Sequence, residues 1–212
     1  MLDVHPPHER MRGFRDFFLH LLTITIGLLI ALGLEGCVEW QHHRRLAHEA
    51  EAGLGVEIAQ NSKFLGTLRQ RISDEQAELD KDLTVLSQTP TRPAATHAPL
   101  SFSFRWSDFD DVAWKTAQST GALNYMPYDD ASAYSKIYAM QAELFNAEQQ
   151  VIDEVLRASS FPSTQPDSWR PTSAQADDLK AHIGLIRMRL LLLSSYVDAL
   201  DKTYKKFNSE HS

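Results

Sequence analysis

The sequence predicts an all-α protein in which an N-terminal transmembrane helix is followed by an antiparallel helical bundle of long amphipathic helices. Three observations predict this fold. An uninterrupted apolar stretch near the N-terminus has the length of a membrane span. Apolar residues recur at alternating 3 and 4 spacing through most of the remaining chain. Two proline-containing stretches interrupt that spacing, which gives the chain room to reverse direction.

Composition and charge exclude several classes of protein. The chain has 212 residues, of which 43% are hydrophobic and 23% charged, so it can bury a core. Its formal net charge of -7 gives no basic footprint for nucleic acid, and no nucleic-acid partner is expected. Cys37 is the single cysteine, which rules out an intrachain disulfide and a cysteine-rich zinc site.

The apolar stretch predicts a transmembrane helix over residues 17–38, preceded by a short tail over residues 1–16. Residues 17–34 read FFLHLLTITIGLLIALGL, without Asp, Glu, Lys or Arg. As a helix they extend roughly 27 Å, close to the ~30 Å hydrocarbon core of a bilayer. Their twelve Phe, Leu and Ile residues favour insertion by roughly 4 to 7 kcal/mol. A buried core helix is the alternative, but such a helix normally has a polar face.

The flanking charges predict the orientation of this span. Arg10, Arg12 and Arg15 precede it, whereas Arg44 and Arg45 follow it. The positive-inside rule therefore favours a cytoplasmic N-terminus, which places residues 39–212 outside the cytoplasm. The later run LIRMRLLLLSSYV is too short for a second span and contains two arginines, so it is expected in a soluble core.

The stretch GLEGCVEWQHHRRLAHEAE, which follows the span, has three interpretations. The first is a membrane rim, in which an amphipathic ring and then cations lie at headgroup depth: Trp40, His42, His43, Arg44 and Arg45. The second is lipid attachment, because residues 34–37 (LEGC) resemble the lipobox of bacterial lipoproteins. Glu35, two residues before Cys37, and the length of the apolar run weigh against lipidation.

The third interpretation is a metal site. Glu39 and His42 form a Glu-x-x-His motif, which places a carboxylate and an imidazole on one helical face as in di-iron bundles. That design needs a second such motif, and the chain has none. The rim is therefore favoured, and no metal or other cofactor is expected.

Small residues within the span predict a helix-association face. Thr23, Gly27 and Ala31 fall four residues apart, which lets two helix backbones approach closely in lipid. Homodimerisation through this face is the resulting hypothesis. The alternative is that these residues reflect only the ordinary frequency of small residues in membrane helices.

Beyond the rim, a long amphipathic helix is predicted. One position of its apolar stripe repeats every seven residues and is occupied by Ile58, Leu65, Ile72, Leu79 and Leu86. Leu54 and Leu68 occupy the second apolar position of the same repeat. Three polar residues interrupt the stripe, namely Asn61, Glu75 and Asp82. Gly53 and Gly55 precede it and predict a flexible joint, because glycine weakens a helix interior.

The remaining elements follow from proline and glycine positions. Residues 89–106 are predicted to be a loop, including a packed SFSFRW segment. A short helix is predicted to start at Ser107 and stop at Gly121, and a long one to run from near Asp129 to about residue 158. Residues 161–172 form a second predicted loop.

The last helix, from about Ser173, has the most regular stripe. It comprises Leu179, Ile183, Ile186, Leu190, Leu193, Val197, Leu200, Tyr204 and Phe207. His182 stands beside this stripe and is expected to be a surface residue.

Two motifs resemble a known family. The run TITIGLLIALGLEG through VEWQHHRR, and the later DDVAWKTAQSTGALNYMPY, resemble a domain-of-unknown-function family of bacterial single-span membrane proteins. The resemblance implies a short N-terminal tail, one span and a long helix beyond it, in the bacterial cytoplasmic (inner) membrane. It implies no activity, ligand or catalytic residue.

The second motif also contains the predicted binding residues. Trp114, Lys115, Gln118 and Thr120 concentrate an aromatic ring, a cation and hydrogen-bonding groups on one short helix. The alternative is that Trp114 packs inward while the polar side chains cap and solvate the helix end.

No nucleophile elbow, His-Glu-x-x-His motif or phosphate-binding glycine loop occurs in the chain, so an enzyme is not expected. The favoured function is a membrane-tethered helical interaction or scaffold module that binds another envelope protein or itself. The alternatives are an extracytoplasmic sensor subunit that acts through a separate partner and a metal-binding bundle.

Overall fold

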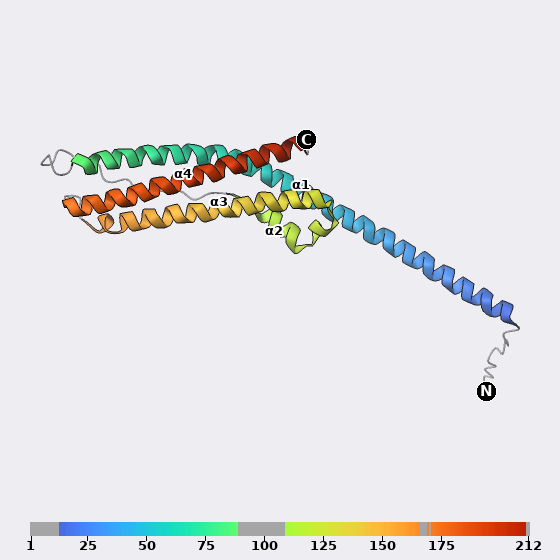
Figure 1. Cartoon of the computed structure of the whole chain (residues 1–212). Helices are drawn as coiled ribbons and strands as arrows, with labels where there is room; N and C mark the ends of the chain where they lie inside the picture. The colour runs from blue at the N-terminus through green and yellow to red at the C-terminus, as the bar shows by residue number, and fades with distance from the viewer. Residues whose placement is uncertain (1–12, 89–108, 166–168, 170, 211–212) are drawn as a thin grey trace, which may run out of the picture. The chain divides into compact units, whose positions relative to one another are not determined.

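The computed structural model describes residues 13–88, 109–165, 169 and 171–210. These residues form an all-helical fold and contain no strand, which confirms the predicted class. The elements in order are α1 (Phe14–Gln88), α2 (Val112–Ser119), η1 (Ala122–Tyr125), α3 (Tyr128–Ser160), η2 (Pro162–Thr164) and α4 (Ser173–Glu210) (Figure 1).

Several predicted boundaries agree with these elements. Gly121 follows α2 with a φ of 72°, in the left-handed region where glycine ends a helix without strain. The predicted start of this helix at Ser107 is corrected, since Phe109, Asp110 and Asp111 are not helical and α2 begins at Val112. The loop predicted over residues 89–106 lies outside the described residues, and the second predicted loop contains the short turn η2.

The chain divides into two compact units, Met1–Glu49 and Ala50–Ser212, called here unit 1 and unit 2. Residues of α1 belong to both. The flexible joint predicted at Gly53 and Gly55 is corrected, because α-helical structure continues through both glycines. Helical hydrogen bonds on either side compensate for the weak helix propensity of two glycines.

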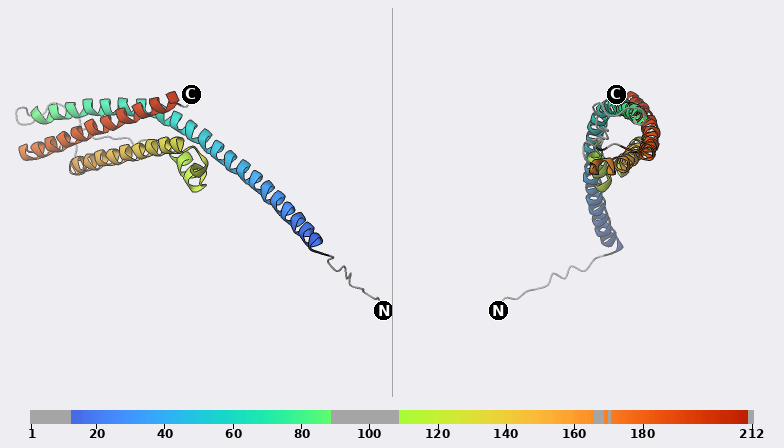
Figure 2. Two further views of the ribbon diagram at one scale, coloured as in Figure 1. Left: turned by 45° about the vertical axis from the view of Figure 1, so that its right-hand side comes forward. Right: turned by 90° about the vertical axis from the view of Figure 1, so that its left-hand side faces the viewer.

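Unit 2 has a core formed by one stripe from each of three long helices. Figure 2 shows α3 and α4 beside the C-terminal part of α1. The core residues of α4 are those of the predicted stripe, all of them buried, together with Ala176. In α1 the polar residues that interrupt the stripe, Asn61, Glu75 and Asp82, are also buried. Each fully buried Leu or Ile stabilises the unit by about 1.5 to 3 kcal/mol.

Polar contacts along α3 and α4 follow opposite residue orders. Near the end of α3, Glu154 contacts His182 near the start of α4. Near the middle of α3, Gln141 donates to Tyr204 near the end of α4. These cross-links fix the register between the two apolar stripes.

Contacts between α1 and α4 also follow opposite residue orders. The Arg69 Nη2 atom lies 2.9 Å from Asp198 Oδ1, and the Arg187 Nη1 atom lies 3.3 Å from Asp80 Oδ1. Both ion pairs are solvent-exposed, so they define register more than they add stability.

Candidate functional site

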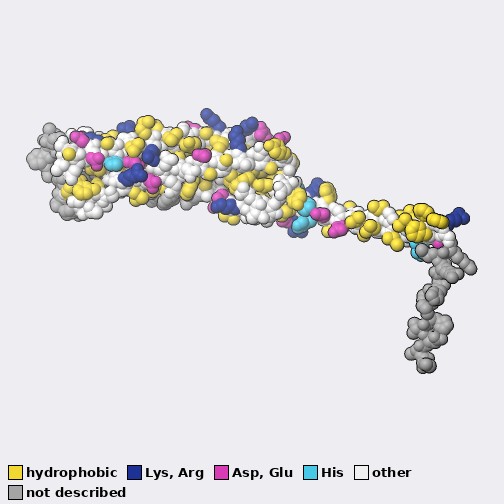
Figure 3. Space-filling view, turned by 60° about the horizontal axis from the view of Figure 1, so that its bottom comes forward, with side chains coloured by type: hydrophobic (Ala, Val, Ile, Leu, Met, Phe, Trp, Pro, Cys, Tyr) yellow, Lys and Arg dark blue, Asp and Glu magenta, His cyan; other side chains and the backbone are white. Residues whose placement is uncertain are grey.

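The feature of unit 1 with the clearest functional meaning is its exposed apolar helix. Within the described residues, one helix is long and apolar enough to cross a membrane, and none of its apolar window is buried. The twelve Phe, Leu and Ile side chains between residues 17 and 34 are 48% to 68% exposed. Figure 3 shows hydrophobic side chains gathered along this part of α1. Soluble monomeric proteins rarely expose a continuous apolar surface of this kind, which usually marks contact with a membrane or a protein partner.

Directly after the apolar helix, the predicted rim residues form a polar collar, defined here as Trp40, His42, His43, Arg44 and Arg45. The indole of Trp40 is 62% exposed, and the Arg44 guanidinium lies over its ring, 5.3 Å from the centroid. The Arg45 Nε atom lies 2.7 Å from the Glu49 carboxylate, which raises the pKa of Arg45 through this hydrogen bond. His42 is exposed and His43 half-buried. An amphipathic ring followed by cations is the chemistry found at headgroup depth.

The predicted helix-association residues lie on an open surface of the apolar helix. A side chain added at Gly27 would meet nothing within 4 Å. The Thr23 hydroxyl donates to the Leu19 carbonyl at 2.8 Å, so its polarity is satisfied within the helix. Thr23, Gly27 and Ala31 are all exposed. A second backbone has room to approach this face.

The residues on which the metal and lipid interpretations depend are Glu39, His42 and Cys37. Glu39 Oε1 lies 4.0 Å from Nε2 of His43, the residue next to the predicted ligand His42. The described residues contain no group of three or more His, Cys, Asp or Glu side chains that could hold a metal ion. Cys37 is a free, exposed thiol.

The four residues predicted as a binding site are divided between two environments. Trp114 is half-buried, and its ring stacks on Tyr138 with a centroid distance of 4.8 Å and an interplanar angle of 6°. Lys115 is exposed and pairs with Asp111 at 2.7 Å. Gln118 and Thr120 are exposed. Trp114 therefore packs against α3, while the other three side chains face solvent.

Two buried polar residues of α1 hold the segment that contains Trp114. The Asn61 side chain donates to the Asp110 carbonyl at 2.8 Å and accepts from the Asp110 amide at 2.9 Å. Glu57, one turn earlier, accepts from the Ala113 amide at 2.7 Å. Its carboxylate thus satisfies the N-terminus of α2. This function was not predicted from the sequence. Its visible signal was Asn61, a polar residue at a position of the apolar stripe, whereas Glu57 lies beside the stripe.

Glu57 also joins a buried polar layer between the long helices. The Tyr138 hydroxyl donates to Glu57 at 2.5 Å, and burial followed by this hydrogen bond raises the pKa of Tyr138 well above its ordinary value. The Gln141 amide donates to the Tyr204 hydroxyl at 2.5 Å, and burial raises the pKa of Tyr204. Both phenols stay neutral at physiological pH. A satisfied polar layer of this kind specifies register in a helical core.

A charge cluster joins the opposite ends of α3 and α4. Glu154, only 1% exposed, lies 2.5 Å from His182 Nδ1, 3.4 Å from Arg157 Nη1 and 3.9 Å from Arg189 Nη2. His182 is therefore not the isolated surface residue that the sequence predicted. Its position beside the stripe lets the ring reach across to α3, which the sequence of α4 alone does not reveal.

A small cavity of about 220 Å³ adjoins this cluster. It is lined by Arg157, Ala158, Phe161, Pro162, Gln175, Asp178, Leu179 and His182. Because Glu154 is surrounded by two arginines and an imidazole, its buried charge is compensated by neighbours. The cluster fastens the end of α3 to the start of α4.

Comparison of the chain with family models, curated proteins and solved structures found no match. The family resemblance therefore remains a prediction based on two motifs. The first motif covers the apolar helix and the polar collar, and the second covers the segment held by Glu57 and Asn61.

Proposed function

We propose that this chain is a single-pass membrane protein whose apolar helix spans the bilayer and tethers a helical interaction module. One observation carries this proposal: residues 17–34 contain no Asp, Glu, Lys or Arg and expose all twelve of their large apolar side chains. Leaving this surface in water is costly, whereas transfer to hydrocarbon is favourable by roughly 4 to 7 kcal/mol.

The polar collar supports the same function. Trp40 and the cations after it suit the outer headgroup region, while Arg15 precedes the apolar helix. With the arginines before the helix in the cytoplasm, unit 2 lies outside it, in the envelope of a bacterial cell. Thr23, Gly27 and Ala31 offer a face for pairing within the membrane.

Unit 2 is the interaction module, built as an antiparallel helical bundle. The reversed order of contacts between α3 and α4, and between α1 and α4, supports this arrangement. Its core polar groups Glu57, Asn61 and Tyr138 are bonded within the unit, where they fix register. This chemistry suits binding through helix surfaces, to another envelope protein or to a second copy, more than catalysis.

The membrane function is tested by making the apolar helix too polar to insert. Two arginines at the centre of a span cost about 5 to 7 kcal/mol, enough to cancel the insertion free energy. We expect wild-type protein to stay in the pellet after an alkaline carbonate wash of cell membranes, and the double variant Ile26→Arg, Leu29→Arg to move to the supernatant. Val56→Arg, at an exposed position of unit 2, is the matched control and should stay in the pellet. Wild-type protein in the supernatant would refute the proposal.

The interaction function is tested by affinity capture of the full-length protein from gently solubilised membranes. We expect a second copy or an envelope protein in reproducible, near-stoichiometric amount. A monomer that carries a bound metal ion or small molecule would contradict an interaction module and favour a ligand-binding bundle.

A further inference from the structure

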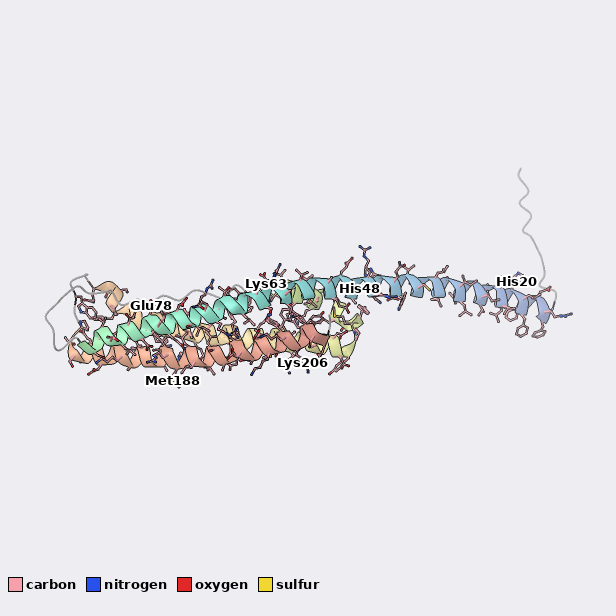
Figure 4. All side chains as sticks on the ribbon, turned by 90° about the horizontal axis from the view of Figure 1, so that it is seen from above. His20, His48, Lys63, Glu78, Met188 and Lys206 are labelled. Carbon is pink, nitrogen blue, oxygen red and sulfur yellow. The ribbon has the colours of Figure 1, made fainter. Side chains whose placement is uncertain are left out.

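The outward face of α4 carries a second apolar stripe, called here the outer stripe. It consists of Ala181, Leu185, Met188, Leu192, Ser195 and Ala199. Leu185, Met188 and Leu192 are 44%, 64% and 49% exposed, and Leu191 beside them is 58% exposed. Figure 4 labels Met188 at the outer edge of α4. The sequence predicted that this leucine-rich run lies in a soluble core, which is correct only for its inward-facing half.

The spacing of the outer stripe is that of a helix-pairing surface. Its members are separated by 4, 3, 4, 3 and 4 residues, the heptad pattern that produces knobs-into-holes packing between two helices. The stripe extends over about 27 Å of helix, at about 1.5 Å per residue. It lies opposite the inner stripe, which is already filled by α1 and α3. A helix with two heptad stripes is built for partners on two sides.

Three charged residues beside the outer stripe contact neighbours within unit 2. Arg187 pairs with Asp80 at 3.3 Å, and Asp198 pairs with Arg69 at 2.9 Å. Arg189 donates to the Gln150 carbonyl at 2.9 Å. The outer stripe itself contains no charged residue, so two copies of it meet without direct contact between like charges.

We propose that the occupant of this face is the same face of a second copy, with the two α4 helices parallel. This inference rests on the proposed membrane function: two chains anchored in one bilayer enter unit 2 at residue 50 from the same side, which favours parallel bundles. In parallel register Leu185, Met188 and Leu192 stack on their counterparts at the centre, and small residues close both ends.

The residues on either side of the outer stripe, called here the border positions, suit the same parallel register. In a parallel pair, a residue on one side of the contact between the two stripes meets the residue five positions later on the other helix. Leu191 thus meets Tyr196 of the second copy, an apolar contact that widens the interface, and Asp177 meets His182 of the second copy, whose Nδ1 atom contacts Glu154 within its own unit 2. None of these border contacts opposes like charges.

Cysteine cross-linking of the full-length protein in membranes tests this arrangement. In a Cys37→Ser background, we expect Ala181→Cys to form a disulfide-linked dimer upon oxidation, because only parallel pairing brings residue 181 near its counterpart. Leu156→Cys, at an exposed apolar position of α3 that is 60% exposed, is the matched control and should not cross-link. Adding Met188→Lys to Ala181→Cys should lower the cross-linked fraction about tenfold or more. Adding Gly27→Leu instead separates this contact from pairing through the membrane helix, and the residue-181 cross-link should persist.

Two results would overturn the inference. The first is no cross-link at residue 181 in protein that resists carbonate extraction, which would leave the membrane function intact and refute only the pairing. The second is cross-linking between co-expressed Ala181→Cys and Ala199→Cys chains without cross-linking of either alone, which would show an antiparallel pair. Release of the wild-type protein by carbonate would refute the proposed function itself.

Discussion

The buried polar residues of α1 differ in how their polarity is satisfied. Glu57 accepts hydrogen bonds from the amides of Ala113 and Trp114, and Asn61 both donates to and accepts from the backbone of Asp110. Glu75 is 9% exposed, and its Oε1 atom accepts no hydrogen bond from the described residues. Burial, and then the negative charges of Asp82 and Glu78, raise the pKa of Glu75 to about 7. The first two residues are structural ties, whereas Glu75 weakens the fold once it is ionised.

The raised pKa of Glu75 gives a pH dependence of known sign. The folded protein binds the proton more tightly than the unfolded chain, so the stability from neutral Glu75 is complete below pH about 4.5 and is lost as pH rises toward about 7. We expect Glu75→Gln to increase the free energy of unfolding at pH 8 by about 1 to 2 kcal/mol and to have little effect at pH 4.5. Urea unfolding of the full-length protein in mild detergent, followed by circular dichroism at both pH values, measures the difference. An equal effect at both would contradict the assignment.

Removal of the Glu57 side chain should destabilise the fold, in contrast to the substitution of Glu75. Glu57→Ala removes the acceptor for the Ala113 and Trp114 amides and for the buried Tyr138 hydroxyl. Because three donors lose their partner, we expect the free energy of unfolding to fall by about 2 to 4 kcal/mol. Glu51→Ala, on the same helix and half-buried, is the matched control with a smaller expected effect. Equal losses from the two variants would show that Glu57 has no special function in holding α2.

The burial of apolar residues could be predicted from the sequence, whereas the contacts of these polar residues could not. The heptad stripes of α1 and α4 predicted which of their residues are buried, because a helix must cover its apolar face. The stripes could not predict that Asn61 and Glu57 bind backbone groups some fifty residues later, nor that His182 reaches Glu154. Such contacts depend on the register between helices, which a single stripe does not specify.

Among the elements, two glycines have opposite functions. Gly55 lies inside α1 with a regular helical conformation, and an added side chain would meet nothing within 4 Å. Gly121 ends α2 with a φ of 72°, where other residues are strained. The sequence predicted the second function correctly, because a glycine after a short helix is a common stop signal. It predicted a joint at Gly55 because propensity ignores the stabilisation that tertiary packing gives to a long helix.

A pair of alanine substitutions tests this distinction. We expect Gly55→Ala to raise the free energy of unfolding by about 0.5 to 1 kcal/mol, since alanine loses less backbone entropy in a helix. Gly121→Ala should lower it by about 1 kcal/mol, because its conformation strains an alanine. Urea unfolding in detergent compares both with the wild type. Destabilisation by Gly55→Ala would indicate that α1 has to bend there.

At the scale of the whole molecule, the predicted topology follows from the charges around the apolar helix. In a Cys37→Ser background, a membrane-impermeant maleimide should label Ser119→Cys, an exposed position of unit 2, in intact spheroplasts. Asp3→Cys should be labelled only after the membrane is permeabilised. We expect the arginines before the apolar helix to cause this asymmetry, because they resist translocation. The reverse labelling pattern would show the opposite orientation.

Whether residues 17–38 cross a bilayer is the central question about this protein, and a depth scan measures it directly. Nitroxide labels placed one at a time along these residues, in the Cys37→Ser background in liposomes, report their relative accessibility to oxygen and to a polar nickel complex. We predict a single maximum of depth near Gly27, with a decline toward both Phe17 and Val38. A shallow profile that repeats every 3.6 residues, or no depth at any position, would contradict a span.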